Sequence, residues 1–282
     1  MALWATGLSQ PCPTDAAAYS QHAWDRPRVL ADIATLHSSV CDARDKARLL
    51  AVTAPHSGDW LHALPISSCG LRLDDEAIRV AIGLRLGTNL CEPHLCPCGE
   101  NVDSRGTHGL ACRRDAGRVV RHHNINDLLC RAFTRAGIPT AKEPSGLFVA
   151  DGKRPDGMTL IPWTGGKSLT WDVTVVDTLA RSHLNVSSTT QGGPSENAAA
   201  AKEAKYSDLP NAYSFAPVAF ETLGPICSSG TALLNKLGRR ISVVTGDARE
   251  RSFLYQRLSV TIQRYNAMSF RGSFIHPSDS NS

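Results

Sequence analysis

The stretch "RPDGMTLIPWTGGKSLTWDVTVVD", residues 154–177, contains two segments rich in apolar and β-branched side chains. Residues 158–161 and 169–176 are separated by a loop that contains proline and two glycines. Such a pattern predicts a β-hairpin with a loop of about five residues. Because Asp is depleted in strands, Asp156 and Asp172 in these segments need a physical explanation.

The hairpin register brings these two aspartates together. If Ile161 pairs with Lys167, counting back along both strands places Asp156 opposite Asp172, with Cβ atoms roughly 4.5–5.5 Å apart. Two carboxylates at such a short distance repel each other unless a proton or a cation lies between them. A divalent cation with oxygen ligands, Mg²⁺ or Mn²⁺, fits this requirement where phosphate is the substrate. The alternative is that Asp156 caps the start of its strand and Asp172 pairs with a nearby arginine.

Composition indicates a globular protein inside the cell. The chain has 282 residues, of which 42% are hydrophobic and 20% charged, as in soluble domains. No apolar run approaches the roughly 20 residues of a membrane span, and the first residues lack the basic segment of a secretory signal. We therefore expect no membrane association, and we expect the nine cysteines to be reduced or metal-bound.

Charge is distributed unevenly along the chain. The first 90 residues carry 8 Lys and Arg against 9 Asp and Glu, whereas residues 91–282 carry 22 against 17. The basic excess in the larger part is compatible with a polyanionic partner without requiring one.

The first 90 residues are predicted to form a helical support region, frayed before about residue 25. Helical spacing covers residues 25–53, with Asp25 as the expected N-cap. A second helix is expected over residues 74–86, ended by Gly87. No residues with an evident chemical role occur in this region.

From residue 115 onward, helical and strand patterns alternate. This order predicts an α/β fold with a mixed sheet. The expected elements are a helix over 116–136, a strand over 143–149, the hairpin, a helix capped by Ser195, a strand over 213–224, and helices over 229–245 and 247–268. We accordingly divide the chain into a helical region (1–90), a Cys/His element (91–114), an α/β domain (115–272) and a disordered tail (273–282).

Four potential zinc ligands lie close together in the Cys/His element. They are Cys96, Cys98, His108 and Cys112. Zinc prefers four tetrahedral Cys and His ligands, and a closed set of four makes a structural site. The C-x-C spacing is tighter than the usual C-x-x-C, so Cys91 or His94 could replace one ligand. The alternative is a group of ordinary reduced cysteines beside a surface histidine.

Several residues around the hairpin follow a known pattern. An acidic residue, Glu143, precedes "RPDG", and "WDVT" and "AKEAKY" follow. On an αβββαβ core this pattern resembles the PD-(D/E)XK nuclease superfamily. It is most similar to the restriction-like endonuclease of site-specific non-LTR retrotransposons, in which a Cys-Cys-His-Cys cluster also precedes the nuclease. The resemblance covers about residues 40–270.

The resemblance implies a role for each matching residue. Asp156 and Asp172 would bind the catalytic Mg²⁺ or Mn²⁺, with Glu143 as a third carboxylate and the Val173 carbonyl as a main-chain ligand. Thr174 stands where the superfamily has a catalytic lysine. The family implies that a lysine on the following helix replaces it, either Lys202 or Lys205, with Tyr206 beside it; Lys205 is favoured because it directly precedes Tyr206.

The function implied is nicking of double-stranded target DNA for insertion of the element. The implied partners are element RNA and a reverse transcriptase module of the parent protein, and the implied location is the nucleus. The chain lacks an aromatic-x-Asp-Asp polymerase signature. Two alternatives stay open: a catalytically inactive, zinc-containing nucleic-acid-binding fragment of a retroelement protein, and a metal-independent scaffold protein.

Two groups of arginines are candidates for contacting DNA. Arg249, Arg257 and Arg264 recur about every two helical turns in the last helix, where they either follow phosphates or form an ordinary solvated face. Arg118 and Arg121, in "GRVVRHH", lie near a helix N-terminus, where backbone amides also favour phosphate. His122 and His123 in the same segment are expected to be helix-surface residues.

Overall fold

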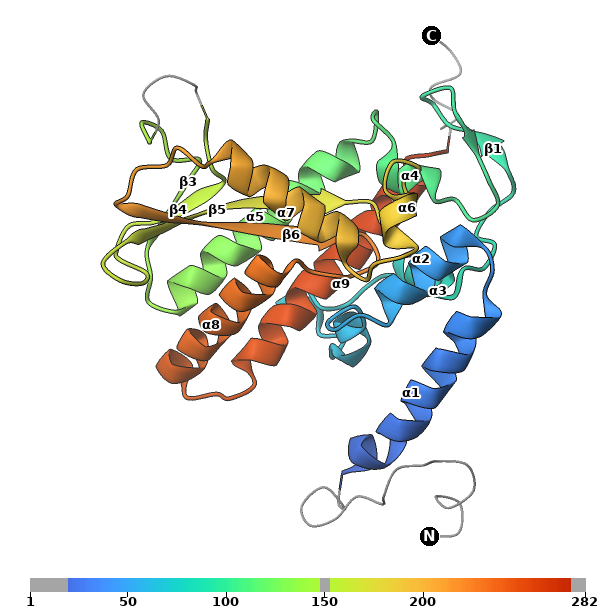
Figure 1. Ribbon diagram of the computed structural model, residues 1–282, viewed down its shortest axis with the longest axis horizontal. Coiled ribbons are helices and arrows are strands. Elements are labelled where there is room, and N and C mark those ends of the chain that lie inside the picture. Colours follow the sequence, from blue (N-terminus) through green and yellow to red (C-terminus); the bar gives the residue numbers. More distant parts are fainter. Residues whose placement is uncertain (1–19, 148–152, 275–282) are drawn as a thin grey trace.

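The computed structural model describes residues 20–147 and 153–274 of the chain (Figure 1). Its N-terminal helices are α1 (Gln21–Ser39), α2 (Ala43–Val52) and α3 (Asp75–Leu86). The single helix expected over 25–53 is therefore wrong, because residues 40–42 separate α1 from α2 and Asp25 lies inside α1. The predicted tail lies outside the described residues from 275 onward.

The caps of α2 and α3 explain where these helices begin and end. Asp42 accepts a hydrogen bond from the Asp45 amide at the start of α2, and Asp74 does the same for Ala77 at the start of α3. Such caps satisfy amides that have no partner within the helix. Gly87 ends α3 with φ +73°, a conformation that favours glycine. The prediction for residues 74–86 is confirmed.

A mixed four-stranded sheet forms the centre of the molecule, as the sequence predicted for an α/β fold. Its strands are β3 (Thr140–Lys142), β4 (Gly157–Thr159), β5 (Ser168–Val176) and β6 (Tyr213–Glu221), in the spatial order β3-β4-β5-β6. The first three strands are antiparallel, and β6 runs parallel to β5. Parallel neighbours need a crossover, and the connection between β5 and β6 contains α6 (Leu184–Ser187) and α7 (Gly193–Lys205).

Helices cover both faces of this sheet (Figure 1). α7 packs on one face against β5 and β6, and α5 (Ala116–Arg135) and α8 (Ser228–Thr245) pack on the other. Side chains alternate along a strand, so Leu169, Trp171 and Val173 of β5 join the core on the α5 side, whereas Asp172 contacts α7. Gly157 is required opposite Trp171, because a Cβ there would lie 2.0 Å from the indole ring.

The last helix, α9 (Glu250–Arg271), connects the sheet to the N-terminal helices. It packs against α3, α5 and α8, and against the short helices η2 (Asp59–His62) and α4 (His108–Ala111). Buried residues occur all around α9, which is typical of a central core helix. None of the helices in the described ranges is long and apolar enough to cross a membrane.

Several predicted element boundaries are wrong. The strand expected over 213–224 ends at Glu221, and the helix expected over 247–268 covers residues 250–271. The strand expected over 143–149 lies earlier, as β3, and ends at Lys142; Glu143 has φ +46° and Pro144 lacks an amide hydrogen, so neither residue continues a ladder easily. Residues 148 and 149 lie outside the described residues. Helix α7 begins at Gly193 with Gly192 as its N-cap and Pro194 in the first turn, where proline is favoured, so Ser195 lies inside the helix.

Candidate functional site

The hairpin register around the two aspartates is the one predicted. Gly157 pairs with Trp171 and Met158 with Thr170, so the next pair along the hairpin is Asp156 and Asp172. Asp156 lies just before β4, and its Oδ2 accepts a hydrogen bond of 2.6 Å from the Val173 amide. The side chain of Asp156 thus replaces a ladder contact where β4 begins.

Asp172 is buried, with 3% of its surface exposed. The Nζ of Lys202 lies 2.7 Å from its Oδ1, and the Tyr206 hydroxyl donates a hydrogen bond of 2.7 Å to its Oδ2. Burial and then the hydrogen bond to Asp172 raise the pKa of Tyr206, so Tyr206 stays a hydroxyl donor at neutral pH. Helix α7 and its C-cap residue therefore supply one cation and one neutral donor to the same carboxylate.

The preference for Lys205 over Lys202 is wrong. Lys205 is exposed, and its Nζ lies 4.8 Å above the ring of Tyr206 rather than at a carboxylate. Residues four apart share a helix face, so Lys202 and Tyr206 both point toward Asp172. Lys205 instead packs its ammonium group over the ring of Tyr206.

Helix α5 contributes two residues that the sequence did not reveal. The Nε2 of His122 lies 2.9 Å from Oδ2 of Asp156, and this hydrogen bond raises the pKa of His122. The expectation that His122 is a plain surface residue is wrong. One turn later, Asn126 donates to the Asp156 carbonyl and accepts from the Trp171 indole, at 2.9 Å each. A polar Asn126 within the apolar stripe of this helix was the signal that could have revealed the contact.

Glu143 and Thr174 lie next to this cluster. The Glu143 amide donates to the Asp156 carbonyl at 3.1 Å, but its side chain is exposed and forms no ion pair with another described residue. Thr174 follows Asp172 on the same face of β5, and its Oγ1 is buried with no hydrogen-bond partner among the described residues. Buried polar atoms are rarely left unpaired.

Oxygen donors lie on and next to β5, but the carboxylates of the described residues do not gather into a metal-binding group there. Two carboxylates, the unpaired Thr174 hydroxyl and the Val173 carbonyl all offer oxygen. The N–H and C=O of one strand residue point to the same edge, so the Val173 carbonyl faces the Asp156 side, as its amide does. However, Lys202 and His122 already compensate the two carboxylates. The structure therefore also agrees with the alternative prediction, in which Asp156 caps a strand and Asp172 pairs with a cation. The cation is Lys202 rather than an arginine.

A second cluster, of cysteine and histidine, could hold a metal ion such as zinc. Ligand atoms of Cys96, Cys98, His108 and Cys112 all lie within 4.8 Å of one another. The first two belong to the hairpin of β1 (His94–Leu95) and β2 (Asn101–Val102), and the other two to helix α4 and its C-cap. Gly99 turns this hairpin with φ +93°.

The thiols in the Cys/His cluster differ in acidity. A backbone hydrogen bond from Glu100 lowers the pKa of Cys98 to about 7, whereas burial raises the pKa of Cys96 to about 12. Zinc binds the thiolate, so binding would release protons. The alternative ligands lie elsewhere: Cys91 donates to the Asp103 carbonyl, and His94 contacts the Ser273 hydroxyl.

The Cys/His cluster is fixed to the end of α9. A Cβ on Gly109 of α4 would lie 2.7 Å from the Ser269 carbonyl, so the two backbones touch. The Cys/His cluster is therefore attached to the core of the protein. The residues of the carboxylate site lie on or next to other helices and strands.

The predicted DNA-contacting arginines are mostly engaged within the protein. Arg121 is 1% exposed and donates to the Asn266 side chain, so the prediction that it contacts DNA is wrong: it faces α9 and the core. Arg257 contacts the Phe253 carbonyl and buried Glu250, Arg264 binds the carbonyls of residues 70 and 72, and Arg249 pairs with Asp247. Arg118 is exposed.

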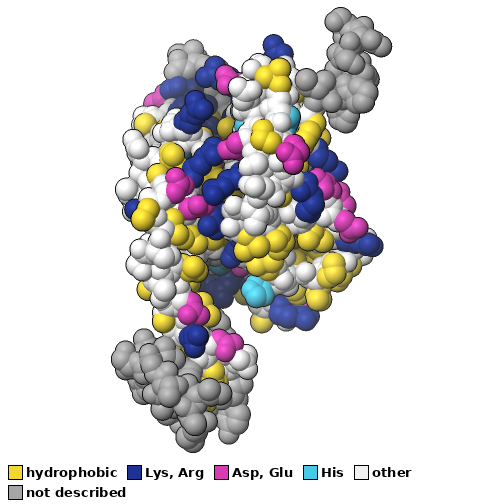
Figure 2. Space-filling model, turned by 90° about the vertical axis from the view of Figure 1, so that its right-hand side faces the viewer, with side chains coloured by type: hydrophobic (Ala, Val, Ile, Leu, Met, Phe, Trp, Pro, Cys, Tyr) yellow, Lys and Arg dark blue, Asp and Glu magenta, His cyan; other side chains and the backbone are white. Residues whose placement is uncertain are grey.

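One face of the molecule shows how its surface charges are arranged. Figure 2 views the side that carries β1 and α3 on the right of Figure 1. Lys and Arg side chains lie among Asp and Glu side chains there, without forming one continuous basic patch.

Neither the known protein-family models nor the curated proteins include a match to this chain.

Proposed function

We propose that this protein is a metal-dependent DNA endonuclease of the PD-(D/E)XK type, related to the restriction-like endonucleases of site-specific non-LTR retrotransposons. One observation carries the proposal. The register of β4 and β5 places Asp156, just before β4, opposite Asp172, and Lys202 of α7 and Tyr206 at its C-cap reach Asp172.

The element order supports this proposal. Helix α5, strands β3, β4 and β5, helix α7 and strand β6 follow one another as in an αβββαβ core, apart from the short α6. The acidic residues precede or occupy the two strands in which the superfamily pattern requires them. Asp156, Asp172 and the Val173 carbonyl would hold Mg²⁺ or Mn²⁺, which activates water and neutralises charge on the phosphate.

The chain's own residues position the reacting groups. Lys202 supplies the positive charge that Thr174 cannot provide, close to the carboxylate that would hold the metal. Tyr206 donates to Asp172 and fixes the orientation of the carboxylate. His122 and the Val173 amide orient Asp156 in the same way. Such preorganised groups lower the barrier because they need not rearrange during the reaction.

The observed ion pairs favour a second candidate function. Both carboxylates already have partners, and the Glu143 side chain is exposed. These features are compatible with a catalytically inactive, zinc-containing nucleic-acid-binding fragment of a retroelement protein. In either case we infer double-stranded DNA, element RNA and a reverse transcriptase module as partners, and the nucleus as the location.

Metal-dependent nicking of supercoiled plasmid distinguishes the two functions. We expect purified protein to nick DNA with Mg²⁺ or Mn²⁺, and we expect EDTA or the Asp172→Asn substitution to abolish nicking. Folded protein that binds DNA but leaves the plasmid intact with both metals would favour the inactive fragment.

A further inference from the structure

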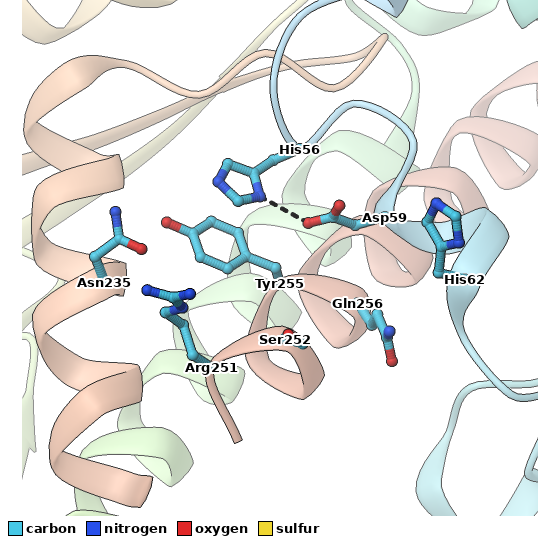
Figure 3. A pocket seen from close by; sticks show the side chains of 8 residues that line it. All are labelled: His56, Asp59, His62, Asn235, Arg251, Ser252, Tyr255 and Gln256. Carbon is cyan, nitrogen blue, oxygen red and sulfur yellow. Dashed lines mark hydrogen bonds and ion pairs between the residues drawn. The ribbon is translucent and has the colours of Figure 1, made fainter. Parts of the chain in front are cut away.

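A cavity of about 480 Å³ lies between the loop around η2 and helices α8 and α9 (Figure 3). Its lining includes His56 and Asp59 from the loop, Asn235 from α8, and Arg251 and Tyr255 from α9. Helix α8 covers the face of the sheet opposite α7, and none of the lining residues belongs to the carboxylate site. Its volume is in the range of small-molecule pockets.

His56 is held in this cavity by three constraints. Its backbone has φ +67°, which is uncommon for a residue with a side chain and often marks functional sites. Its ring stacks on Tyr255 with centroids 3.7 Å apart and planes 5° apart. Its Nδ1 lies 2.8 Å from Oδ2 of Asp59. Because Asp59 accepts this hydrogen bond, Nδ1 carries the hydrogen and Nε2 remains for a ligand.

Arg251 provides an unpaired positive charge beside His56. It is exposed and forms no ion pair with any residue in the described ranges, unlike Arg257 and Arg264 of the same helix. Its stem packs closely on α8, where a Cβ on Gly238 would lie 2.8 Å from the Arg251 Cα. The guanidinium and the amide of Asn235 point toward the hydroxyl end of Tyr255 (Figure 3).

The cavity offers hydrogen-bond donors suited to an anion. Asp59 is the one carboxylate in the described lining, and its hydrogen bond ties it to His56. Arg251 and Asn235 supply donors, and an arginine fork matches the oxygens of phosphate. The Tyr255 hydroxyl donates to the Thr231 carbonyl at 3.2 Å, so its oxygen is left as an acceptor.

We propose that this cavity binds a phosphate ester. Arg251 and Asn235 donate to the phosphate, and Nε2 of His56 accepts from a hydroxyl or N–H of the esterified group. The volume exceeds what a bare phosphate needs and leaves space for the group esterified to it. A mononucleotide and a nucleic-acid backbone both offer this chemistry. The assignment does not depend on the nuclease proposal.

The test compares two probes and four variants of the full chain. ATP is titrated by calorimetry, and a fluorescent oligothymidylate by anisotropy at fixed salt. Arg251→Ala removes the cation. Arg239→Ala is the matched control, because Arg239 is an exposed arginine of α8 outside the cavity lining. His56→Asn removes the imidazole while keeping a residue that tolerates positive φ, and its thermal midpoint reports whether it folds.

We expect Arg251→Ala to raise the dissociation constant about tenfold, the loss of one charge-assisted contact, and His56→Asn to raise it several-fold. Arg239→Ala should change it less than about twofold. An effect on ATP alone identifies a mononucleotide site, and an effect on the oligonucleotide alone identifies a backbone site. If neither probe binds, or if Arg251→Ala behaves as Arg239→Ala does, the proposal is overturned. Asp172→Asn should retain binding even if nuclease activity is absent.

Discussion

The Cys/His cluster and the carboxylate site are assembled in opposite ways. The four soft ligands come from one short segment, residues 96–112, and gather within 4.8 Å. The carboxylate site combines α5, the start of β4, β5 and α7, so its residues extend from His122 to Tyr206. Lys202 and His122 lie beside the carboxylates, whereas the side chains that contact the thiols in the described residues are the other thiols and His108. This difference predicts that metal binding contributes mainly to stability at the first site and mainly to chemistry at the second.

The largest effect is expected from Asp172→Asn. This substitution removes the negative charge that Lys202 and Tyr206 contact. The nicking rate should fall by about 10³-fold or more, as when an enzyme loses one electrostatic contact to the transition state. Single-turnover plasmid cleavage measures the rate, and circular dichroism checks the fold. Wild-type cleavage by this variant would remove the carboxylate site from the proposed mechanism.

The next largest effect is expected at the Cys/His cluster and concerns stability. Cys112→Ser should abolish binding of about one zinc per chain and lower the thermal midpoint by roughly 5–10 °C, because structural zinc contributes folding energy. Cys91→Ser is the matched control, since Cys91 bonds to the Asp103 carbonyl outside the cluster. Equal midpoints for both variants, with no zinc found by metal analysis, would contradict a structural metal.

A smaller effect separates the two lysines of α7. Lys202→Ala should lower cleavage by about 10²-fold with little change in DNA affinity, the pattern of a contact made mainly in the transition state. Lys205→Ala should stay within a few-fold of wild type, because Lys205 contacts the Tyr206 ring and pairs with no carboxylate of residues 20–147 and 153–274. A reversed order would show that α7 rotates when DNA binds.

The smallest effect concerns His122. His122→Gln keeps a donor that can reach Asp156, so cleavage should fall less than about tenfold, whereas His122→Ala should fall further because Asp156 loses one of its two orienting contacts. Cleavage rates of the two variants at one pH make the comparison. Identical rates would show that the Val173 amide alone suffices to hold Asp156.

Much of the local structure followed from the sequence. The alternation of residues 154–177 set the hairpin and its register, because side-chain period and loop length leave few pairings that keep one face apolar. Asp74 and Gly87 marked both ends of α3. The spacing of Cys96, Cys98, His108 and Cys112 grouped four ligands that the structure brings together. In each case the deciding interactions lie within a few residues along the chain.

Tertiary packing decided the rest. The sequence showed two lysines on one helix, but only the seating of α7 on β5 placed Lys202 at Asp172 and Lys205 outside. The sequence also showed a row of arginines in the last helix. Because α9 lies in the core, Arg257 and Arg264 bind groups within the protein. Packing of α9 on α5 likewise buries Arg121. His122 and Asp156 are 34 residues apart, and His56 and Tyr255 meet only because the η2 loop packs on α9. Contacts across such separations depend on how whole elements pack, which no local pattern encodes.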